Sequence, residues 1–533
     1  MAGRAICAPV FNVADYGARG DGSEPATDAI RHAIEAAHTA GGGTVYIPAG
    51  RYITGPIELV SNLVLHIEAG ATLSFPAARL PYTKGRTQGI ETVGPVPLIG
   101  GHDLENATIT GRGVITTDNA EWVRLMGGAT PRSASGPGSA FGPDWNRLLA
   151  DLQTQTPRQE AEYLKIAPFL RPAFIRFMDS RNILVEGIHM IGAPFWSIHM
   201  LYSENIAIHN VTLGTFPGIF TGGIYIDSSR DVRISDSSFD NGDDAIALKA
   251  GKDADGLRVN RSTENVTISN VVVHRGSGCI VMGSETSGGI RNVVVSNVVC
   301  QNTQNGINIK SERGRGGSVE DVRIDNVEMD NVGRAISISQ FYQMQGEQTL
   351  AQEPVSRRTP VFRNIAITHV TISRARGVID YSWNPDGIAG VGAHPPQPLT
   401  IDIAGLPEMP IAGLRMTDLV SNSPGGLRAS NTVGMELHNV QMNTEGVPGF
   451  LIRDSRDLEL DGVSSRQPVK GMPVLRLDRC AGAVVRNSHA FSGTGTFLSA
   501  GPGEIKGMRL IGNALGHAAK ATEESTVDFW REP

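Results

Sequence analysis

The phrase NVTISN (265–270) returns almost unchanged as NVVVSN (292–297) and DVRIDN (321–326). Each copy begins with Asn or Asp, and its apolar residues alternate with other residues, so we expect a strand with one face pointing inward. Further copies are NLVLHI (62–67), NATITG (106–111), NILVEG (182–187), NIAIHN (205–210), DVRISD (231–236) and NIAITH (364–369), with weaker ones at LRMTDL (414–419), MELHNV (435–440) and LELDGV (458–463).

The central copies start 23 to 34 residues apart, and a period of this size with one strand per period indicates a solenoid. A second strand is expected between the phrases, at GGIYIDSS (222–229), DAIALKAG (244–251), GCIVMGSE (278–285), GINIKSER (306–313) and RAISISQF (334–341). Short strands that pair in parallel from turn to turn predict an all-β fold, a parallel β-helix. No linker divides the chain, so we expect a single domain over residues 1–533.

The ends and interruptions of the repeat can also be located. A stack of strands has open edges, and a helix at about 27–40, capped by Thr27 or Asp28, is expected to cover the first one. The predicted N-terminal cap spans about 10–45 and the coils about 46–515. Two tracts interrupt the coils and are expected to be insertions: 118–165, with a helical stretch around 147–152, and 341–360.

The composition of the chain limits which binding partners we expect. The chain has 533 residues, 40% of them hydrophobic and 19% charged, and a net charge of −7, which argues against nucleic acid as a partner. No apolar run reaches the roughly 18 to 20 residues that span a bilayer, and no signal peptide is visible in MAGRAICAPVFNV (1–13). The four cysteines show no metal-binding spacing, and the sequence favours buried thiols over a disulfide.

The most informative polar sequence is Asn241-Gly242-Asp243-Asp244, directly before a predicted strand. A regular strand would send two adjacent carboxylates to opposite faces, but Gly242 permits a bend that brings both to one groove. One protonated and one ionised carboxyl group are what general acid–base chemistry requires. A plain turn is the alternative, because Asn, Gly and Asp are turn residues.

Cations follow further along the chain. We expect Lys310 to face the same region in register, with Arg313 and Arg315 in the Gly-rich loop after it, a set that suits a carboxylate-bearing sugar. The alternative is a solvated loop whose arginines pair with Glu312 and Glu320. Glu285 is either a polar contact or part of a turn. The remaining polar residues of this region are expected to be structural: His199, His274, Asp227 and Ser228, the last two bonding the backbone of the next turn.

Several long, ordered segments of the chain resemble glycoside hydrolase family 28, the polygalacturonase family, and within it the bacterial exo-acting branch. They are FNVADYGARGDG (11–22), GGGTVYIPAGRY (41–52), RPAFIRF (171–177), APFWSIHMLYSENI (193–206), the stretch 226–270, GSETSGGIRNV (283–293), NGINIKSERGRGG (305–317) and IAGLPEMPIAGL (403–414). The resemblance implies a right-handed parallel β-helix that hydrolyses α-glycosidic bonds, typically in pectin, with inversion and without a metal or other cofactor. It also implies a secreted or periplasmic protein.

The resemblance assigns roles to some residues. Asp243 is implied as the general acid, Asp244 as the base that orients water, and Lys310 as the group that holds the galacturonate carboxylate. Three positions depart from the family's motifs: Gly222 stands for an aspartate, Ser277 for a histidine and Asn308 for an arginine. Within a pectic substrate of galacturonan or rhamnogalacturonan type, we therefore expect a scissile bond that does not join two plain galacturonates. A rhamnose-containing or neutral sugar fits better, with Tyr225 or Glu285 compensating.

Three functions remain open from the sequence. The first is an exo-acting hydrolase of a pectic oligosaccharide or polysaccharide, with one groove end walled by 118–165, 252–261 and 341–360. The second is a β-helix that binds glycans without cleaving them; it should carry aromatic platforms, and aromatics make up only 6% of the chain. The third is a polysaccharide lyase, which the absence of an acidic cluster of Ca²⁺-ligand type disfavours.

Overall fold

The computed structural model describes residues 9–125, 160–216, 218, 220–342, 351–376 and 399–527. It is a right-handed parallel β-helix with an N-terminal capping helix, as predicted. Two compact units divide the chain, Met1–Val271 and Val272–Pro533, and each is described in turn. The helical stretch predicted around 147–152 and residues 343–350 of the second predicted insertion lie outside the described residues. Among the described residues, no helix is both long and apolar enough to cross a membrane.

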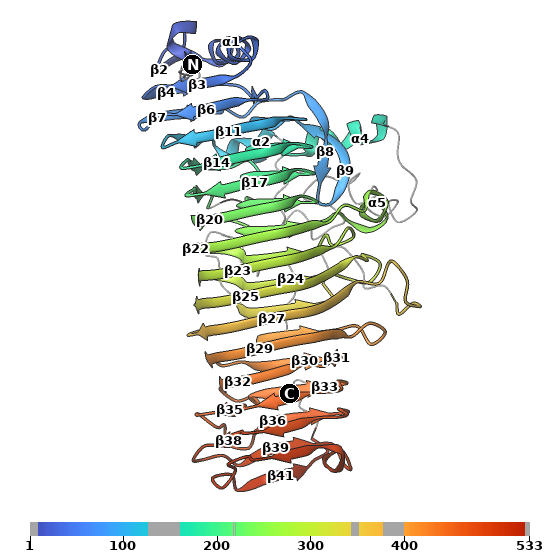
Figure 1. The fold of residues 1–533 in the computed structure, drawn as a ribbon. Helices are drawn as coiled ribbons and strands as arrows, with labels where there is room; N and C mark the ends of the chain where they lie inside the picture. Colours follow the sequence, from blue (N-terminus) through green and yellow to red (C-terminus); the bar gives the residue numbers. More distant parts are fainter. Residues whose placement is uncertain are drawn as a thin grey trace, which may run out of the picture. The chain divides into compact units, whose positions relative to one another are not determined.

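The first unit consists mainly of short strands (Figure 1). They are β1 (Val10–Asn12), β2 (Asp21–Pro25), β3 (Gly43–Ile47), β4 (Gly50–Ile53), β5 (Ile57–Glu58), β6 (Leu63–Ile67), β7 (Ala71–Ser74), β8 (Tyr82–Thr87), β9 (Ile90–Pro95), β10 (Ile99–His102), β11 (Glu105–Gly111), β12 (Val114–Thr116), β13 (Ile175–Met178), β14 (Arg181–Glu186), β15 (His189–Ile191), β16 (Ile198–Leu201), β17 (Glu204–His209), β18 (Thr212–Gly214), β19 (Ile224–Asp227), β20 (Arg230–Asp240) and β21 (Ile246–Lys249). Its helices are α1 (Thr27–Thr39), α2 (Asn119–Leu125), α4 (Glu160–Ile166) and α5 (Asp253–Val259), with short 3-10 helices at Val13–Tyr16 and Ala167–Phe169.

The strand β22 (Thr263–Gly283) runs from the first unit into the second. The second unit contains β23 (Ile290–Gln301), β24 (Thr303–Lys310), β25 (Ser318–Asp330), β26 (Arg334–Ser339), β27 (Val361–Ile372), β28 (Leu399–Ala404), β29 (Ile411–Asn422), β30 (Gly426–Ser430), β31 (Thr432–Val433), β32 (Glu436–Asn443), β33 (Phe450–Arg453), β34 (Glu459–Asp461), β35 (Ser464–Ser465), β36 (Pro473–Asp478), β37 (Val484–Arg486), β38 (His489–Ala490), β39 (Thr496–Ala500), a 3-10 helix (Ile505–Gly507), β40 (Arg509–Ile511) and β41 (Lys520–Glu524). All twelve repeated phrases and all five intervening strands of the sequence analysis coincide with strands.

The Asn or Asp at the start of each phrase has a structural reason. Asn62, Asn106, Asn182 and Asn205 all have positive φ angles between 50° and 61°, a conformation that Asn tolerates better than most residues. Their amides form a ladder from coil to coil, in which Asn182 Nδ2 donates to Asn106 Oδ1 at 2.9 Å and Asn205 Nδ2 donates to Asn182 Oδ1 at 2.7 Å. The repeated residue therefore both turns the chain and joins successive coils.

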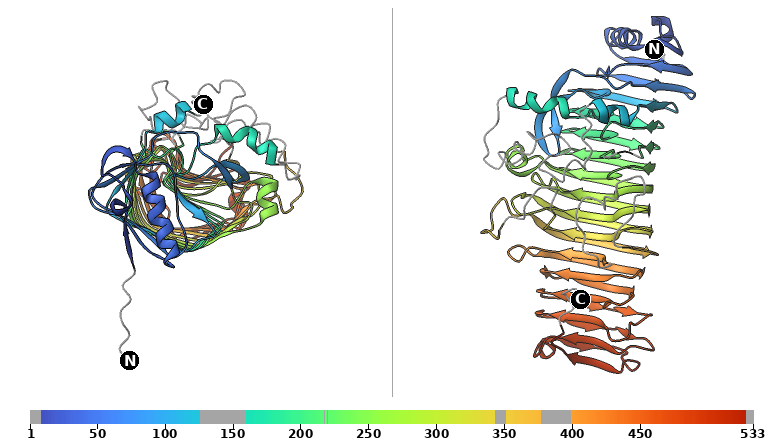
Figure 2. Two further views of the ribbon diagram at one scale, coloured as in Figure 1. Left: turned by 90° about the horizontal axis from the view of Figure 1, so that it is seen from above. Right: turned by 180° about the vertical axis from the view of Figure 1, so that it is seen from behind.

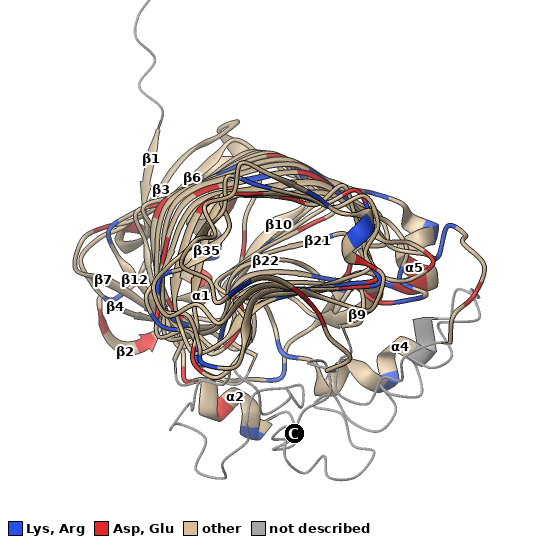
Figure 3. Cartoon of the chain, turned by 90° about the horizontal axis from the view of Figure 1, so that it is seen from below, with Lys and Arg blue, Asp and Glu red and all other residues tan. Residues whose placement is uncertain are grey.

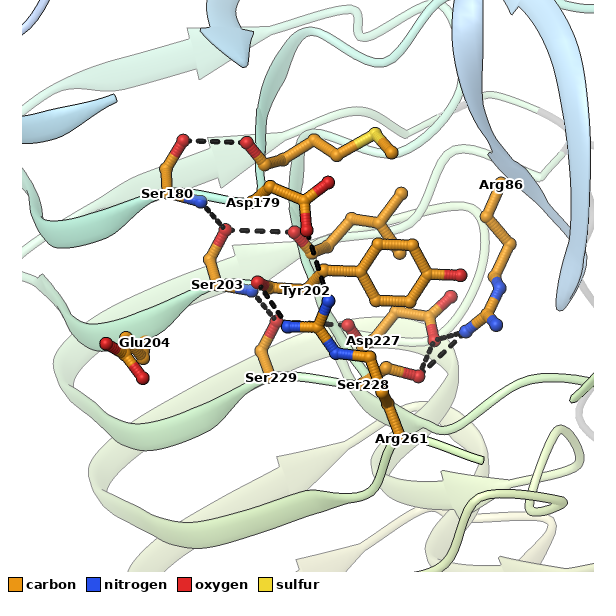
Figure 4. A network of polar contacts seen from close by, with 12 residues as sticks. Arg86, Asp179, Ser180, Tyr202, Ser203, Glu204, Asp227, Ser228, Ser229 and Arg261 are labelled. Atoms are coloured by element: carbon orange, nitrogen blue, oxygen red, sulfur yellow. Dashed lines mark hydrogen bonds and ion pairs between the residues drawn. The ribbon is translucent and has the colours of Figure 1, made fainter. Parts of the chain in front are cut away.

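A second ladder, formed by serine hydroxyl groups, joins successive coils of the first unit (Figure 4). The backbone N–H of Ser180 donates to Ser203 Oγ at 3.1 Å, and that of Ser203 donates to Ser229 Oγ at 2.9 Å. All three serines are buried, so each hydroxyl satisfies a backbone donor that water cannot reach.

Helix α1 covers the first coil of its unit (Figure 2). Its Ala29, Ile30, Ala33, Ile34 and Ala37 are buried, as the helical spacing predicted. The predicted cap was wrong, because Ala26 occupies the N-cap position and no side chain caps the helix there. Instead, Thr27 Oγ1 accepts a hydrogen bond from the backbone N–H of Gly55 at 2.8 Å, so it ties the helix to a coil.

One sheet of the first unit positions most of the residues discussed below. Its strands β10, β13, β16, β19 and β21 pair in parallel, which puts Ile175, Ile198, Ile224 and Ile246 in one inward row. Because side chains alternate along a strand, the neighbouring residues form rows on the outer face. One such row is Arg176, His199, Tyr225 and Ala247, and another contains Asp227 and Lys249.

An antiparallel hairpin, β8–β9, departs from the coils of the first unit (Figure 1). The sequence analysis did not predict it. It leaves the stack after β7, and the chain rejoins the coils at β10. Helix α5, with Asp253, Asp255 and Arg258, lies outside the coils of the same unit (Figure 3).

The second unit holds a disulfide that the sequence analysis did not favour. Cys279 and Cys300 are joined, with Cα atoms 6.0 Å apart, and both side chains are fully buried. Both point inward from different strands, which a separation of 21 residues in the sequence does not reveal. Cys480 keeps a free thiol whose pKa burial raises to about 12, and Cys7 lies outside the described residues.

Candidate active site

The two adjacent aspartates lie in a bend just before β21. Asp243 Oδ1 accepts a hydrogen bond from the backbone N–H of Asp244 at 2.9 Å, and the Asp244 carbonyl accepts one from Gly223 at 2.9 Å. Asp243 is half-buried, whereas Asp244 is buried. The bend needs the predicted glycine, because a Cβ at Gly242 would lie 1.6 Å from the carbonyl oxygen of Gly218.

A cation that the sequence analysis missed acts on this bend. Burial lowers the pKa of Arg171 to about 10, and the negative charge of Asp243 opposes that change. The guanidinium group also lies 5.3 Å from the ring centroid of Phe195. Arg171 therefore places a positive charge close to one of the two candidate catalytic carboxylates and favours its ionised form.

Tyr225 fills the space beside Gly222. A Cβ at Gly222 would lie only 2.3 Å from both Oη and Cε2 of Tyr225. The ring is 2% exposed and stacks on Trp196, with centroids 4.1 Å apart and planes 8° from parallel. Gly222 and Tyr225 are thus a matched pair, since any side chain at 222 would compete with this ring for the same space.

Aromatic rings gather here despite their scarcity in the chain. Phe195 also stacks on Trp196, with ring centroids 4.8 Å apart. His199 meets the Trp196 ring edge-on, with the same centroid distance of 4.8 Å. The ammonium group of Lys249 lies 5.6 Å from the Tyr225 centroid and 5.9 Å from that of Trp196. The first unit therefore holds an aromatic cluster, Phe195, Trp196 and Tyr225, flanked by cations.

The side chain of Asp227 was predicted to bond the backbone of the next turn, and this prediction is wrong. Its Oδ1 accepts a hydrogen bond from Arg86 Nη1 at 2.8 Å, and the same nitrogen donates to Ser228 Oγ at 2.7 Å (Figure 4). Burial alone would raise the pKa of Asp227, but the positive charge of Arg86 outweighs it and holds that pKa well below its usual range. The prediction failed because Arg86 comes from the unpredicted hairpin.

Further polar contacts fix the hairpin to the coils. Tyr202 Oη donates to Glu91 Oε1 at 2.8 Å, and Arg258 of α5 pairs with Glu91. The tip is held as well, because the backbone N–H of Lys252 donates to the Gly89 carbonyl at 2.9 Å. The Tyr202 ring lies between two guanidinium groups, those of Arg86 at 4.8 Å and Arg261 at 4.6 Å (Figure 4).

The remaining predicted residues belong to the second unit. Lys310, at the end of β24, is 8% exposed, and its Nζ lies 4.8 Å from the ring centroid of Tyr342. Asn308 on the same strand is 6% exposed and Glu285 is 2% exposed. Ser277 is half-buried, and its carbonyl accepts a hydrogen bond from Asn305 Nδ2. That these residues share a groove with Asp243 and Asp244 stays a prediction.

The two loop arginines are paired with acids inside the second unit. Arg313 donates to both carboxylate oxygens of Glu408, and Arg315 pairs with Glu312 and donates to the Ser284 carbonyl at 2.7 Å. The side chain of Arg315 has no exposed surface. The geometry therefore gives Arg315 a part in holding its own loop together, and a sugar could reach it only if that loop moved.

One group of potential metal ligands occurs among the described residues, on the strands that hold His438, Glu459 and Asp461. Arg486 already pairs with both of these carboxylates. Because the guanidinium group neutralises them, the arrangement carries no argument for a cation.

Two protein-family models match parts of this chain. The model of the family described as "Glycosyl hydrolases family 28" matches residues 167–380, and one described as "Rhamnogalacturonase A/epimerase, pectate lyase-like" matches residues 10–73. This family 28 match covers about two fifths of the chain, which is therefore similar to glycosyl hydrolase family 28 over residues 167–380. Asp243, Asp244, Tyr225, Arg171 and Lys310 all lie within the family 28 match, whereas the hairpin β8–β9 lies outside both matched ranges.

Relatives of this chain are named as polygalacturonases or galacturonosidases. The chain is 29% identical over 331 residues to a "Probable polygalacturonase" of Vitis vinifera, which covers 60% of this chain and 60% of that protein. It is 27% identical over 389 residues to the "Exo-poly-alpha-D-galacturonosidase" of Dickeya chrysanthemi, covering 69% of this chain and 63% of that protein. The match thus spans less than two thirds of either relative's length.

Two solved structures of exopolygalacturonases have the same fold. The exopolygalacturonase of Thermotoga maritima superposes with a TM-score of 0.68 at 27% identity, covering 81% of this chain and 91% of that one. The family 28 exopolygalacturonase of Yersinia enterocolitica gives 0.59 at 20% identity, covering 88% and 78%, and supports the fold alone.

Proposed function

We propose that this protein hydrolyses an α-glycosidic bond in a pectic oligosaccharide or polysaccharide, releasing single sugars from a chain end with inversion. The observation that carries the proposal is the adjacent pair Asp243 and Asp244 in a bend that only Gly242 permits. In the proposed mechanism Asp243 protonates the leaving oxygen and Asp244 activates a water on the opposite face of the sugar. The mechanism needs no metal.

Asp243 must carry a proton to act as the acid, while Arg171 favours its ionised form. We therefore propose that substrate binding changes this balance, because a sugar that excludes water weakens the ionised form of a carboxylate. The opposite assignment, with Asp244 as the acid, is distinguished by the pH dependence of kcat of Asp243→Asn and Asp244→Asn, because only the variant that lacks the acid loses the decline of kcat at high pH.

Action at a chain end is supported by the relatives' names and by the hairpin β8–β9. The hairpin is tied to Asp227, Tyr202 and the segment around Lys252, just beyond the strand that follows the two aspartates. Export is supported by the Cys279–Cys300 disulfide, since disulfides persist mainly in oxidising compartments. We propose a secreted or periplasmic protein.

The test is incubation with galacturonan and rhamnogalacturonan oligosaccharides of defined length, with the products measured by mass spectrometry and the anomer by NMR. We expect monosaccharides of inverted configuration. Asp243→Asn and Asp244→Asn should each lower kcat by at least about 10²-fold, whereas Asp236→Asn, at an exposed position of β20, should not. Near-full activity of either variant would refute the assigned roles, and unsaturated products that depend on Ca²⁺ would indicate a lyase.

One observation favours a second candidate, binding of a glycan without hydrolysis. Gly222 provides no carboxylate, and the Tyr225 ring occupies the adjacent space beside Trp196. Tight binding of an oligosaccharide with no product after prolonged incubation would support this candidate instead.

A further inference from the structure

Arg176 of β13 is a buried cation, and two of its guanidinium nitrogens have no acceptor in the part of the chain that the structure describes. It is 7% exposed, and its Nε and Nη2 atoms are buried without a hydrogen-bond partner among the described residues. Burial lowers its pKa to about 10, and no neighbouring acid opposes that change. A buried charge without a partner is strongly unfavourable, so this guanidinium group is suited to an anion supplied from outside the chain.

His199 offers a second group at the same place. It is in register with Arg176 on the neighbouring strand, and its Nε2 is also buried without a hydrogen-bond partner. The nearest acid oxygen, Asp227 Oδ2, is 3.8 Å away, which is too long for a hydrogen bond. Burial lowers the pKa of His199, so the ring is neutral at pH 7 and has one N–H to donate.

Two other arginines of this unit already interact with acids. Arg86 pairs with Asp227, and Arg171 interacts with Asp243. The hairpin also limits the room around Arg176, because a Cβ at Gly85 would lie 2.8 Å from Arg176 Nη1. A carboxylate suits this space, since it is planar and its two oxygens match two guanidinium N–H groups.

We propose that Arg176 and His199 bind the carboxylate of an acidic sugar unit of the substrate and set the specificity of the site. A sugar is the source that the surroundings favour, because His199 contacts the Trp196 ring and is in register with Tyr225. This inference rests on the proposed function for its substrate class. It also offers carboxylate recognition in a chain that has Asn308 where the family motif has arginine.

The test compares binding of galacturonic acid and galactose, which differ at the carboxylate, by calorimetry with the full chain. We expect the wild type to prefer galacturonic acid by about 10- to 100-fold, the range for a charge-assisted hydrogen bond. Arg176→Gln should abolish the preference and Arg176→Lys should retain part of it. Arg181→Gln, the same change at an exposed arginine of the next strand, should leave it unchanged.

Thermal unfolding separates this role from a structural one. Arg176→Gln removes an unpaired buried charge, so it should raise the melting temperature of the ligand-free chain and abolish the further rise with galacturonic acid. A lower melting temperature, or no preference in the wild type, would overturn the proposal. Acetate that binds as tightly as galacturonic acid would overturn the assignment to a sugar. Binding through Arg176 without any turnover would keep this inference and refute hydrolysis.

Discussion

Arg86 Nη1 lies 2.8 Å from Asp227 Oδ1, although 141 residues separate the two, and neither side chain has exposed surface. Replacing one partner leaves the other buried and unpaired, so Arg86→Met should lower the free energy of unfolding by about 3–5 kcal/mol. The double variant with Asp227→Asn should recover much of that loss. Urea unfolding of the set measures the coupling, and additive losses would contradict it.

The same pair sets a pH dependence. The folded pKa of Asp227 lies below its unfolded value of about 3.9, so its contribution is complete above that value and is lost as the pH falls towards the folded pKa. The stability difference between the wild type and Asp227→Asn should therefore be constant from pH 7 to about 5 and shrink below about pH 4. A difference that grows on acidification would contradict this sign.

Gly222 and Tyr225 should behave as a coupled pair. Gly222→Ala places a Cβ 2.3 Å from a ring that Trp196 holds in place, so overpacking should cost about 1–3 kcal/mol. In a Tyr225→Leu background, which lacks the atoms that clash, the same change should cost less than about 1 kcal/mol. Thermal or urea unfolding distinguishes these outcomes, and an equal cost in both backgrounds would rule out the proposed contact.

The asparagine ladder gives a fourth test. Asn182→Ala removes two ladder hydrogen bonds and puts alanine at a φ of 58°, so we expect a loss of about 2–3 kcal/mol. Asn182→Gly removes the same hydrogen bonds but accepts positive φ, and should recover about 1 kcal/mol. Equal losses would show that the backbone conformation contributes nothing measurable.

The coils were predictable because one type of residue has two structural roles. Asn182 and its equivalents turn the chain and bond a neighbouring coil, so Asn or Asp returns in nine of the twelve phrases beside alternating apolar residues. The repeat depends on residues close together in the sequence. The glycine of the bend at Gly242 was predicted for its flexibility, but the structure gives another reason, because the carbonyl of Gly218, 24 residues earlier, leaves no room for a Cβ.

Features that depend on distant residues were not predictable. The hairpin β8–β9 is polar and carries no repeat, so nothing local indicated that Arg86 would meet Asp227. Arg176 sits in a strand as an ordinary alternating polar residue, and only the structure shows that no acid faces it. The Cys279–Cys300 disulfide likewise required knowing which side chains point into the same coil.

The tie between the hairpin and Asp227 restricts how this part of the chain can change length. Successive parallel strands are about 4.8 Å apart, so deleting the one turn between Asn182 and Asn205, 23 residues, would displace Asp227 by that distance. Arg86 would then face a different residue. Repeat architectures otherwise tolerate insertions and deletions of whole turns. Between the hairpin and β19, we expect such changes to break the Arg86–Asp227 pair and destabilise the protein.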